Sequence, residues 1–228
     1  MQESLTKKKL GNDLLAVFII TCIPIILFMI LGQNKILGVA HGWPLLFQTI
    51  YTAFFQFSIA GLGLAVVMLY RKEKFSLYGL KRKNILISCI MGVVFSGVFV
   101  FLSYIEKGSI YYLPFRQVNL TADILKAGLP VSIIAMAFVV LAWGFFEGFN
   151  YIYISRKINQ LIPIKIPFLR LGPIIMGISC IFIHGAVGQN MLAILGSFLI
   201  IYLTLMIFEL TDNAWGCILV FILYWNAV

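Results

Sequence analysis

The residues of this chain that could do chemistry lie inside apolar stretches, where polar side chains are rare. Glu147 is the one carboxylate well within an apolar run, His184 is one of two histidines, and Asn226 lies near the end of the last run. An ionisable side chain deep in hydrocarbon costs about 2.5 to 3.5 kcal/mol on insertion scales, so each one calls for a reason. A carboxylate near an imidazole suits general-base catalysis or proton transfer, and a buried pair of this kind can also set the register of two helices.

The elements that must position these residues are membrane helices. Hydrophobic residues make up 62% of the 228 residues and charged residues 11%, against roughly a quarter charged in soluble domains. A soluble core of this size needs a polar shell, and the composition does not supply one. The same composition excludes a disordered chain, and four cysteines within apolar runs do not indicate a disulfide scaffold.

Seven apolar runs predict seven helices in one membrane domain that covers residues 1–228. About 20 residues cross a hydrocarbon layer of ~30 Å, and most of the runs reach that length. We therefore expect an all-α, polytopic transmembrane helix bundle in which the first run is a retained anchor and not a cleaved signal. The runs are residues 14–31, 43–70, 85–105, 131–154, 171–187, 191–208 and 214–228.

The net charge of +9 is explained by cations that flank the apolar runs, so we do not expect nucleic acid as a partner. With the amino terminus in the cytoplasm, 4 of the 17 Lys and Arg residues fall on the outer side. The positive-inside rule therefore predicts a cytoplasmic amino terminus. We expect a multi-pass protein of a bacterial plasma membrane, with the lipid bilayer as its first partner. The 13 inner cations are Lys7, Lys8, Lys9, Arg71, Lys72, Lys74, Lys81, Arg82, Lys83, Arg156, Lys157, Lys165 and Arg170.

Helical rise places the three candidate residues at similar depths. If the fourth helix continues through Arg156 and Lys157, then Glu147 and His184 each lie ~20 Å from the inner end of their helices. If it stops at residue 154, a mismatch of ~10 Å separates them. Asn226 is ~18 Å along the last helix, at the level of His184.

Two further patterns lie on the same helices. Gln48, Thr52 and Gln56 recur every four residues, which predicts a polar stripe that forms hydrogen bonds between helices. Gly144 and Gly148 form a Gly-x-x-x-Gly pair, which favours the close approach of another helix.

In their order and spacing, Glu147, His184 and Asn226 resemble the CAAX protease and bacteriocin-processing (CPBP, or Abi) family of intramembrane proteases. The resemblance covers roughly residues 130–228 and includes Trp143-Gly-Phe-Phe-Glu147 and the approach to the last motif at residues 211–215. It implies an intramembrane metalloendopeptidase that cleaves a membrane-bound peptide or a lipidated protein. It implies Glu147 as the general base on water, His184 and Asn226 as the groups that polarise the carbonyl, and zinc as the metal.

The chain departs from the family pattern, which is Glu-Glu-x-x-x-Arg, Phe-x-x-x-His and His-x-x-x-Asn or Asp. Gly148 stands in place of the second Glu, Ile152 in place of the Arg, Cys180 in place of the Phe, and Ile222 in place of the first His. A catalytic zinc takes three protein ligands and a water. With Glu147 as the base, His184 is the one metal ligand left by the resemblance, so the zinc ligand set is incomplete.

Three functions are consistent with these residues. The first is a CPBP-type endopeptidase, with CAAX-type or leader-peptide proteolysis by a glutamate-activated water. The second is a catalytically degenerate homologue, a pseudoenzyme that acts as a membrane binding, immunity or chaperone-like protein. The third is a small proton-coupled carrier, because an acid and a histidine in a membrane also suit a proton relay.

Overall fold

The computed structural model describes residues 2–108, 112–164, 166, 168–186 and 191–227 of the chain, and within its helices it leaves out the side chains of residues 2–5, 33–34, 106–107, 184–186 and 192. Within these ranges every regular element is a helix. The helices are α1 (Gln2–Leu31), α2 (Gln33–Gly38), α3 (Leu45–Ala60), α4 (Leu62–Arg71), η1 (Phe75–Tyr78), α5 (Ile85–Lys107), α6 (Thr121–Lys126), α7 (Val131–Val139), η2 (Val140–Phe146), α8 (Glu147–Leu161), α9 (Leu171–Ala186), α10 (Met191–Thr211), α11 (Trp215–Val220) and η3 (Phe221–Trp225).

The chain is an all-α membrane protein, as the composition predicts. By length and composition, four described helical segments can cross a membrane: Thr6–Leu31, Ile85–Ile105, Val131–Leu161 and Ala193–Thr211. A fifth crossing is formed if the bent pair α3 and α4 counts as one. The predicted runs 171–187 and 214–228 contain shorter apolar helices, Leu171–Ile183 and Trp215–Trp225. The seven apolar runs are therefore all helical, but they are not seven helices of full spanning length.

The run at 43–70, predicted as one helix, is two helices that meet at Gly61 with a bend of 62°. A side chain at Gly61 would overlap the ring of Phe57, and its Cβ would also lie 3.1 Å from Phe146. The rings of Phe57 and Phe146 pack edge to face with centroids 4.7 Å apart. The break therefore brings α3 tightly against the residue that precedes Glu147.

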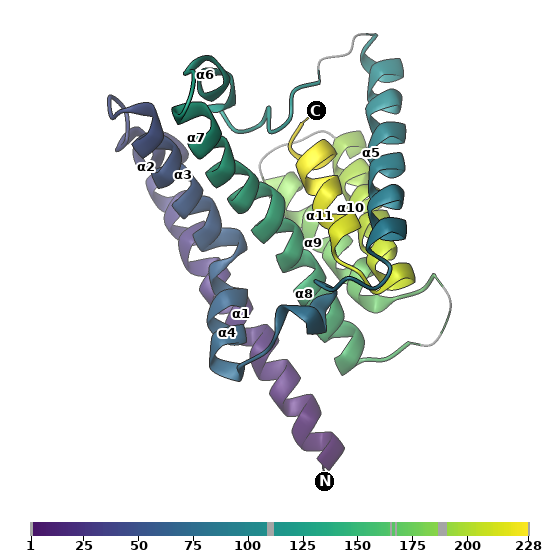
Figure 1. The fold of residues 1–228 in the computed structure, drawn as a ribbon. Helices are drawn as coiled ribbons and strands as arrows, with labels where there is room; N and C mark the ends of the chain where they lie inside the picture. The colour runs from purple at the N-terminus through teal and green to yellow at the C-terminus, as the bar shows by residue number, and fades with distance from the viewer. Residues whose placement is uncertain (1, 109–111, 165, 167, 187–190, 228) are drawn as a thin grey trace.

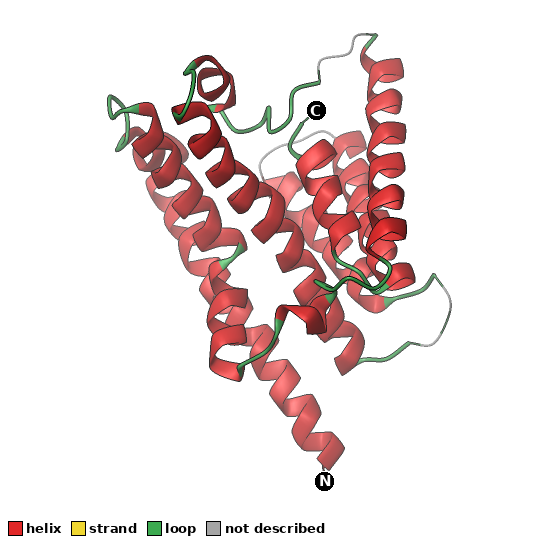
Figure 2. Ribbon diagram, viewed as in Figure 1, coloured by secondary structure: helices red, strands yellow, loops and turns green. Residues whose placement is uncertain are grey.

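The helices form two groups on either side of one long helix (Figures 1 and 2). α1, α3 and α4 lie together in one group, and α5, α9, α10 and α11 lie in the other. α7, η2 and α8 run between them as one continuous helix over Val131–Leu161. Phe149, Ile152 and Tyr153 of α8 are fully buried, so this helix supplies the centre of the main core.

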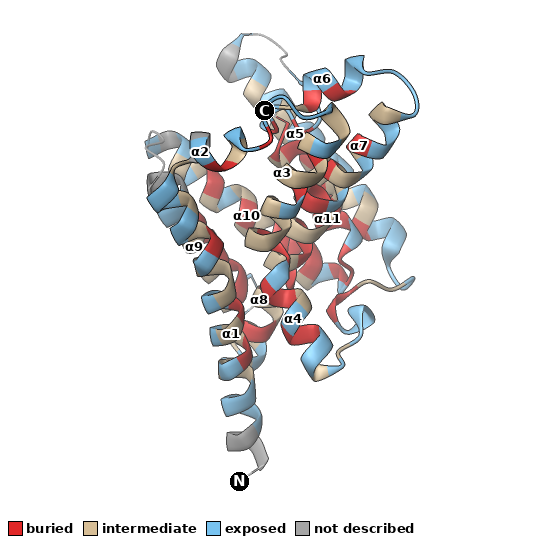
Figure 3. Cartoon of the chain, turned by 90° about the vertical axis from the view of Figure 1, so that its left-hand side faces the viewer, coloured by how far each residue is buried: buried red, intermediate tan, exposed pale blue. Residues whose placement is uncertain are grey.

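The outer faces of the helices are apolar and exposed, while the buried residues lie between them (Figure 3). Met29, Leu69 and Phe182 are 72%, 78% and 72% exposed. Large apolar side chains at such exposure are expected where the surrounding solvent is hydrocarbon, because there is no cost of contact with water.

The register of α8 against α9 decides which residues meet across this interface. α8 continues through Arg156 and Lys157 to Leu161, as the depth argument requires. A Cβ at Gly172, on the first turn of α9, would overlap the Ser155 carbonyl oxygen. The two backbones are therefore in close contact at one end, and the antiparallel pairing continues from there along both helices.

Candidate functional site

Glu147 lies at the end of a wide helical turn. Residues Val140–Phe146 form a π-helix, and α8 begins at Glu147 itself. Segments of this kind are rare, and they are found frequently at functional sites. A π-helical turn holds one residue more than an α-helical turn. The side chains of α8 are therefore rotated about the helix axis relative to the positions that a continuous α-helix from α7 would give them.

Two neutral donors from distant helices hold the Glu147 carboxylate. The side-chain amide of Gln56 on α3 donates to Oε2 at 2.9 Å, and the indole N–H of Trp225 on η3 donates to Oε1 at 2.8 Å. Each carboxylate oxygen keeps a further lone pair for a water or a ligand. Three elements that are far apart in the sequence therefore converge on one acid.

Only one residue of the predicted polar stripe on α3 reaches another helix through a side-chain hydrogen bond. Thr52 donates to the carbonyl oxygen of Gln48, and Gln48 donates to the carbonyl oxygen of Trp43, so both bonds are local. Gln56 alone reaches Glu147. The period-four pattern signalled that Gln56 faces inward, but it did not identify the acid as its partner.

Asn226 lies next to this acid site at the end of a second π-helix, Phe221–Trp225. Its side chain is 5% exposed and its amide donates to the carbonyl oxygen of Trp143 at 3.4 Å. Trp143, Glu147, Trp225 and Asn226 all line the same cavity. The structure thus brings Glu147 and Asn226 together, and it adds Gln56 and Trp225, which were not predicted as site residues.

His184 lies on α9, and its side chain is outside the described part of the structure. One turn before it, the Cys180 thiol lies 3.0 Å from the Tyr151 hydroxyl of α8, which is one turn after Glu147. Glu147 is four residues before Tyr151, and His184 is four residues after Cys180. Because α8 and α9 run antiparallel, both steps cover ~6 Å in the same direction in space. The register is consistent with Glu147 and His184 at one depth, and contact between their side chains stays a prediction.

Three departures from the family pattern are filled by packed core. A Cβ at Gly148 would lie 2.9 Å from the Phe221 ring, so no acid fits there without movement of η3. Ile152 is fully buried in the main core. The side chain of Ile222 packs against Gly144. These positions therefore contribute apolar packing between helices where the family motif has polar groups.

The described residues do not form a metal centre. No group of three or more His, Cys, Asp or Glu side chains lies close enough to hold a metal ion in the part of the chain that the structure describes. The donors around Glu147 are an amide and an indole, and neither is a usual zinc ligand. The described groups do not fit the zinc that the family resemblance implies, and we derive no chemistry from a metal.

A large cavity extends from Glu147 along the bundle. Its volume is about 1410 Å³, above the 300 to 1,000 Å³ typical of pockets for drug-sized ligands. Its wall is formed by residues of α1, α3, α5, η2, α8, α9, α10 and η3, together with Gln117 and Asn226. We call this space the central cavity. On α8 its wall extends from Glu147 to Ile158, a distance of ~16 Å by helical rise.

A second polar centre lies near the amino-terminal end of the bundle. Lys157 is 1% exposed, and its ammonium lies 2.8 Å from Asp13 and 2.9 Å from Glu73. Arg71 forms a further ion pair with Asp13 at 2.7 Å. We call these four residues the buried ion cluster. In the sequence these residues lie outside the apolar runs or at the end of a predicted helix. No pattern predicted that their side chains form one cluster.

A tyrosine completes the buried ion cluster. The Tyr78 hydroxyl donates to Glu73 at 2.7 Å. Burial raises the pKa of Tyr78 above its usual value, and the hydrogen bond to Glu73 raises it further. Tyr78 therefore stays a neutral donor at physiological pH and satisfies a carboxylate oxygen that faces away from Lys157.

Searches against protein families, curated proteins and solved structures each find no match for this chain. The resemblance to the CPBP family therefore stays a prediction.

Proposed function

We propose that this protein is a membrane-embedded binding protein that holds a hydrophobic ligand in the central cavity, with Glu147 as the polar contact. The observation that carries the proposal is a half-buried carboxylate, fixed by Gln56 and Trp225, in the wall of a cavity of about 1410 Å³. An ordered acid at the edge of an apolar cavity orients a ligand that also has a polar group. The candidate ligands include a membrane-bound peptide and a lipidated protein segment.

The packed departures from the family motif support binding over catalysis. Acyl transfer to water needs a base and also donors that stabilise the oxyanion. Gln56 and Trp225 already donate to Glu147, and Asn226 donates to Trp143. These three donors are thus engaged with the protein itself, as expected of a pseudoenzyme that binds or shields its partner.

The second candidate function is a CPBP-type endopeptidase. The observation that favours it is that Glu147 and Asn226 line one cavity, and that His184 follows Cys180 by one turn on the helix that contacts Tyr151. In this case Glu147 would activate water, and His184 and Asn226 would polarise the scissile carbonyl.

One experiment separates the two functions. Wild-type protein, Glu147→Gln and a cavity-filling Ser179→Trp variant are reconstituted in nanodiscs with hydrophobic and lipidated peptides. Binding is followed by tryptophan emission, and cleavage by mass spectrometry. We expect binding without cleavage by the wild type and loss of binding in Ser179→Trp.

The other outcomes identify what is wrong. Cleavage by the wild type that disappears in Glu147→Gln would replace the binding function by the peptidase. Equal binding by the wild type and Ser179→Trp would contradict a role for the central cavity, provided that both variants melt like the wild type. Asp212→Asn is the matched control, because it removes an exposed carboxylate far from the cavity wall.

We also infer that the helices cross a bacterial plasma membrane several times with the amino terminus in the cytoplasm. Four segments of spanning length and a strong charge asymmetry support this arrangement. The binding function then takes its ligand from the lipid phase and not from the aqueous phases.

A further inference from the structure

The wall of the central cavity has one charged group among the residues that the structure describes. That group is Glu147, and no Lys or Arg occurs in the described lining. An unbalanced carboxylate in a medium of low dielectric constant attracts a cation strongly and repels an anion. The cavity therefore disfavours the binding of fatty acids and other anionic amphipaths.

Aromatic rings surround this acid. Trp143, Tyr151, Tyr224 and Trp225 line the same cavity. The ring of Phe221 packs between two of them, with centroid distances of 5.3 Å to Tyr151 and 5.8 Å to Trp225. Hydrogen bonds fix Tyr151 to Cys180 and Trp225 to Glu147, so the aromatic wall is ordered before a ligand arrives.

A carboxylate within an ordered aromatic wall is the chemistry that recognises an ammonium group. A cation over the face of Trp or Tyr gains about 2 kcal/mol or more where water is excluded. Neither Lys nor Arg from the described lining competes for this position. A primary or quaternary ammonium can pair with the carboxylate while its methyl or methylene groups contact the rings.

The rest of the cavity fits an apolar chain. From Glu147 toward the amino-terminal end of the bundle, α8 lines the cavity with Asn150, Tyr151, Ile154 and Ile158, and the facing part of α9 is Ile175 and Met176. The wall from Glu147 to Ile158 is ~16 Å long and its far end is apolar, which fits an alkyl chain attached to a polar group at Glu147. The shape alone would also admit a neutral amphipath, so the charge decides between them.

The edge of the cavity is in contact with the lipid phase. Phe18 of α1 and Phe182 of α9 both line it and are 66% and 72% exposed, and Leu102 of α5 is 50% exposed. A ligand with an alkyl chain can thus enter from the hydrocarbon between these helices, without the transfer of its chain through water.

We propose that the central cavity binds a lipid-like amphipath with an ammonium head group, which pairs with Glu147 within the aromatic wall while its alkyl chain fills the apolar part of the cavity. This inference rests on the proposed binding function and names its ligand class. Dodecyltrimethylammonium is a suitable probe, and dodecyl maltoside is its uncharged match with the same chain.

The test compares the two probes on protein in nanodiscs, below their micellar concentrations, by titration of tryptophan emission. We expect the wild type to bind the ammonium probe about tenfold more tightly than the neutral probe. Glu147→Gln should remove this preference, and Asp212→Asn should retain it. Trp143→Leu should reduce the affinity for the ammonium probe and leave the affinity for the neutral probe unchanged.

The outcomes distinguish this inference from the function on which it rests. Equal affinity of the wild type for both probes, or a preference that persists in Glu147→Gln, would overturn the ammonium assignment and leave a binding cavity in place. Failure of both probes to bind, with Ser179→Trp indistinguishable from the wild type, would overturn the binding function as well. Dodecyl sulfate bound as tightly as the ammonium probe would contradict the charge argument directly.

Discussion

At the scale of single residues, the buried ion cluster requires the most explanation. Lys157 has lost nearly all contact with solvent, and two carboxylates compensate for that desolvation. Its ammonium also lies 5.0 Å from the centre of the Tyr153 ring. A buried charge of this kind is tolerated only while every partner is present, because removal of one leaves the others unpaired. The cluster joins α1, the segment after α4, and α8 at one point.

The first prediction concerns Lys157. Replacement by Met, which fills a similar volume, leaves Glu73 without its ammonium partner and Asp13 with Arg71 alone, and should cost about 3 to 5 kcal/mol of the free energy of unfolding. Thermal unfolding in detergent measures the loss. The double variant Lys157→Met, Glu73→Gln should recover much of it, since the carboxylate left without a cation is gone while Asp13 keeps Arg71. A single variant as stable as the wild type would show that Lys157 is not needed for charge balance.

The second prediction concerns pH and Asp212, which forms ion pairs with Lys81 and with Arg156, the latter at 2.7 Å. Burial by itself would raise the pKa of Asp212, but the hydrogen bonds from Lys81 and Arg156 outweigh it and lower the pKa below its usual value. The carboxylate therefore adds stability above the usual Asp pKa of about 3.9, and this contribution is lost as the pH falls through the lowered pKa.

The expected size of the Asp212 effect is small. The side chain of Asp212 is 53% exposed, so solvent screening keeps its contribution below about 1 kcal/mol. Melting temperatures of the wild type and Asp212→Asn are compared between pH 6 and the acid limit of folding. We expect the wild type to be slightly more stable at pH 6 and the two curves to converge in acid. A difference that grows on acidification would contradict the sign of the shift.

At the scale of elements, close backbone contacts determine how the helices cross. A Cβ at Gly92 of α5 would overlap the carbonyl oxygen of Gly216 of α11, and a Cβ at Gly216 would overlap the carbonyl oxygen of Ser88. The backbone N–H of Gly216 also donates to the Ser88 hydroxyl at 2.9 Å. Contacts of this kind between small residues are a main source of helix association in membranes.

The third prediction uses two glycines of the same helix. Gly92→Ala forces α5 away from α11 and should destabilise the protein by about 1 to 3 kcal/mol. At Gly97 a Cβ has no neighbour within 4 Å, so Gly97→Ala should be neutral or should stabilise the helix by roughly 0.5 to 1 kcal/mol. Thermal unfolding of both variants provides the comparison. Equal stability of the two would mean that the approach of α5 to α11 is not tight.

The elements also explain which parts of the site could be predicted from the sequence. Apolar length and one isolated acid are sufficient to predict a helical bundle with Glu147 inside it. The sequence left open whether the fourth helix ends at residue 154 or continues through Lys157, and the structure continues it to Leu161. The break at Gly61 was not predicted: the Phe57 ring lies over Gly61 and packs against Phe146, a tertiary contact that leaves no local pattern in the sequence. The wide turns at residues 140–146 and 221–225 likewise depend on tertiary packing and leave no periodic signal.

The partners of Glu147 follow the same logic. Gln56 comes from a stripe whose other members form local bonds, and Trp225 is an aromatic residue in an apolar run, which normally indicates packing alone. The rotation of η3 about its axis decides whether the indole N–H of Trp225 reaches Glu147. No local pattern in the sequence indicates that rotation. The sequence therefore predicted Glu147 and Asn226 of this site, and the packing of α3 and η3 adds Gln56 and Trp225 to them.

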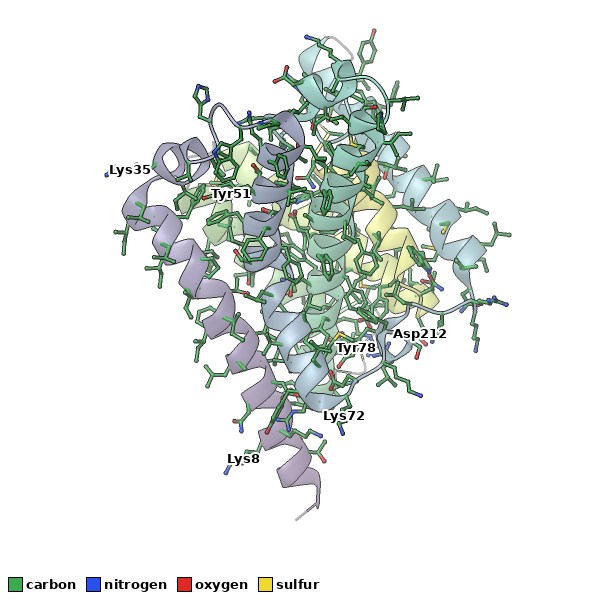
Figure 4. The ribbon with its side chains drawn as sticks, turned by 60° about the vertical axis from the view of Figure 1, so that its left-hand side comes forward. Lys8, Lys35, Tyr51, Lys72, Tyr78 and Asp212 are labelled. Atoms are coloured by element: carbon green, nitrogen blue, oxygen red, sulfur yellow. The ribbon has the colours of Figure 1, made fainter. Side chains whose placement is uncertain are left out.

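At the scale of the whole molecule, cations gather at the amino-terminal end of the bundle. Figure 4 shows Lys8 and Lys72 at this end and Lys35 at the opposite end. The acids of this end whose side chains the structure describes have internal partners: Asp13 and Glu73 belong to the buried ion cluster, Asp212 pairs with Lys81, and Glu209 pairs with Arg170 at 3.8 Å. The remaining basic surface matches an anionic cytoplasmic leaflet, where each cation near the surface gains about 1 kcal/mol.

The last prediction tests this orientation by cysteine labelling. Lys74 and Asn119 are both exposed, and they lie in the loops on opposite sides of the long helix α5. A membrane-impermeant maleimide added to intact cells should label Asn119→Cys and should reach Lys74→Cys only after the membrane is permeabilised. The parent chain is the control, because its four cysteines lie in apolar helices where a charged reagent has no access. Labelling of Lys74→Cys in intact cells would contradict the proposed topology. The basic end of the bundle would then face outward, which the positive-inside rule disfavours.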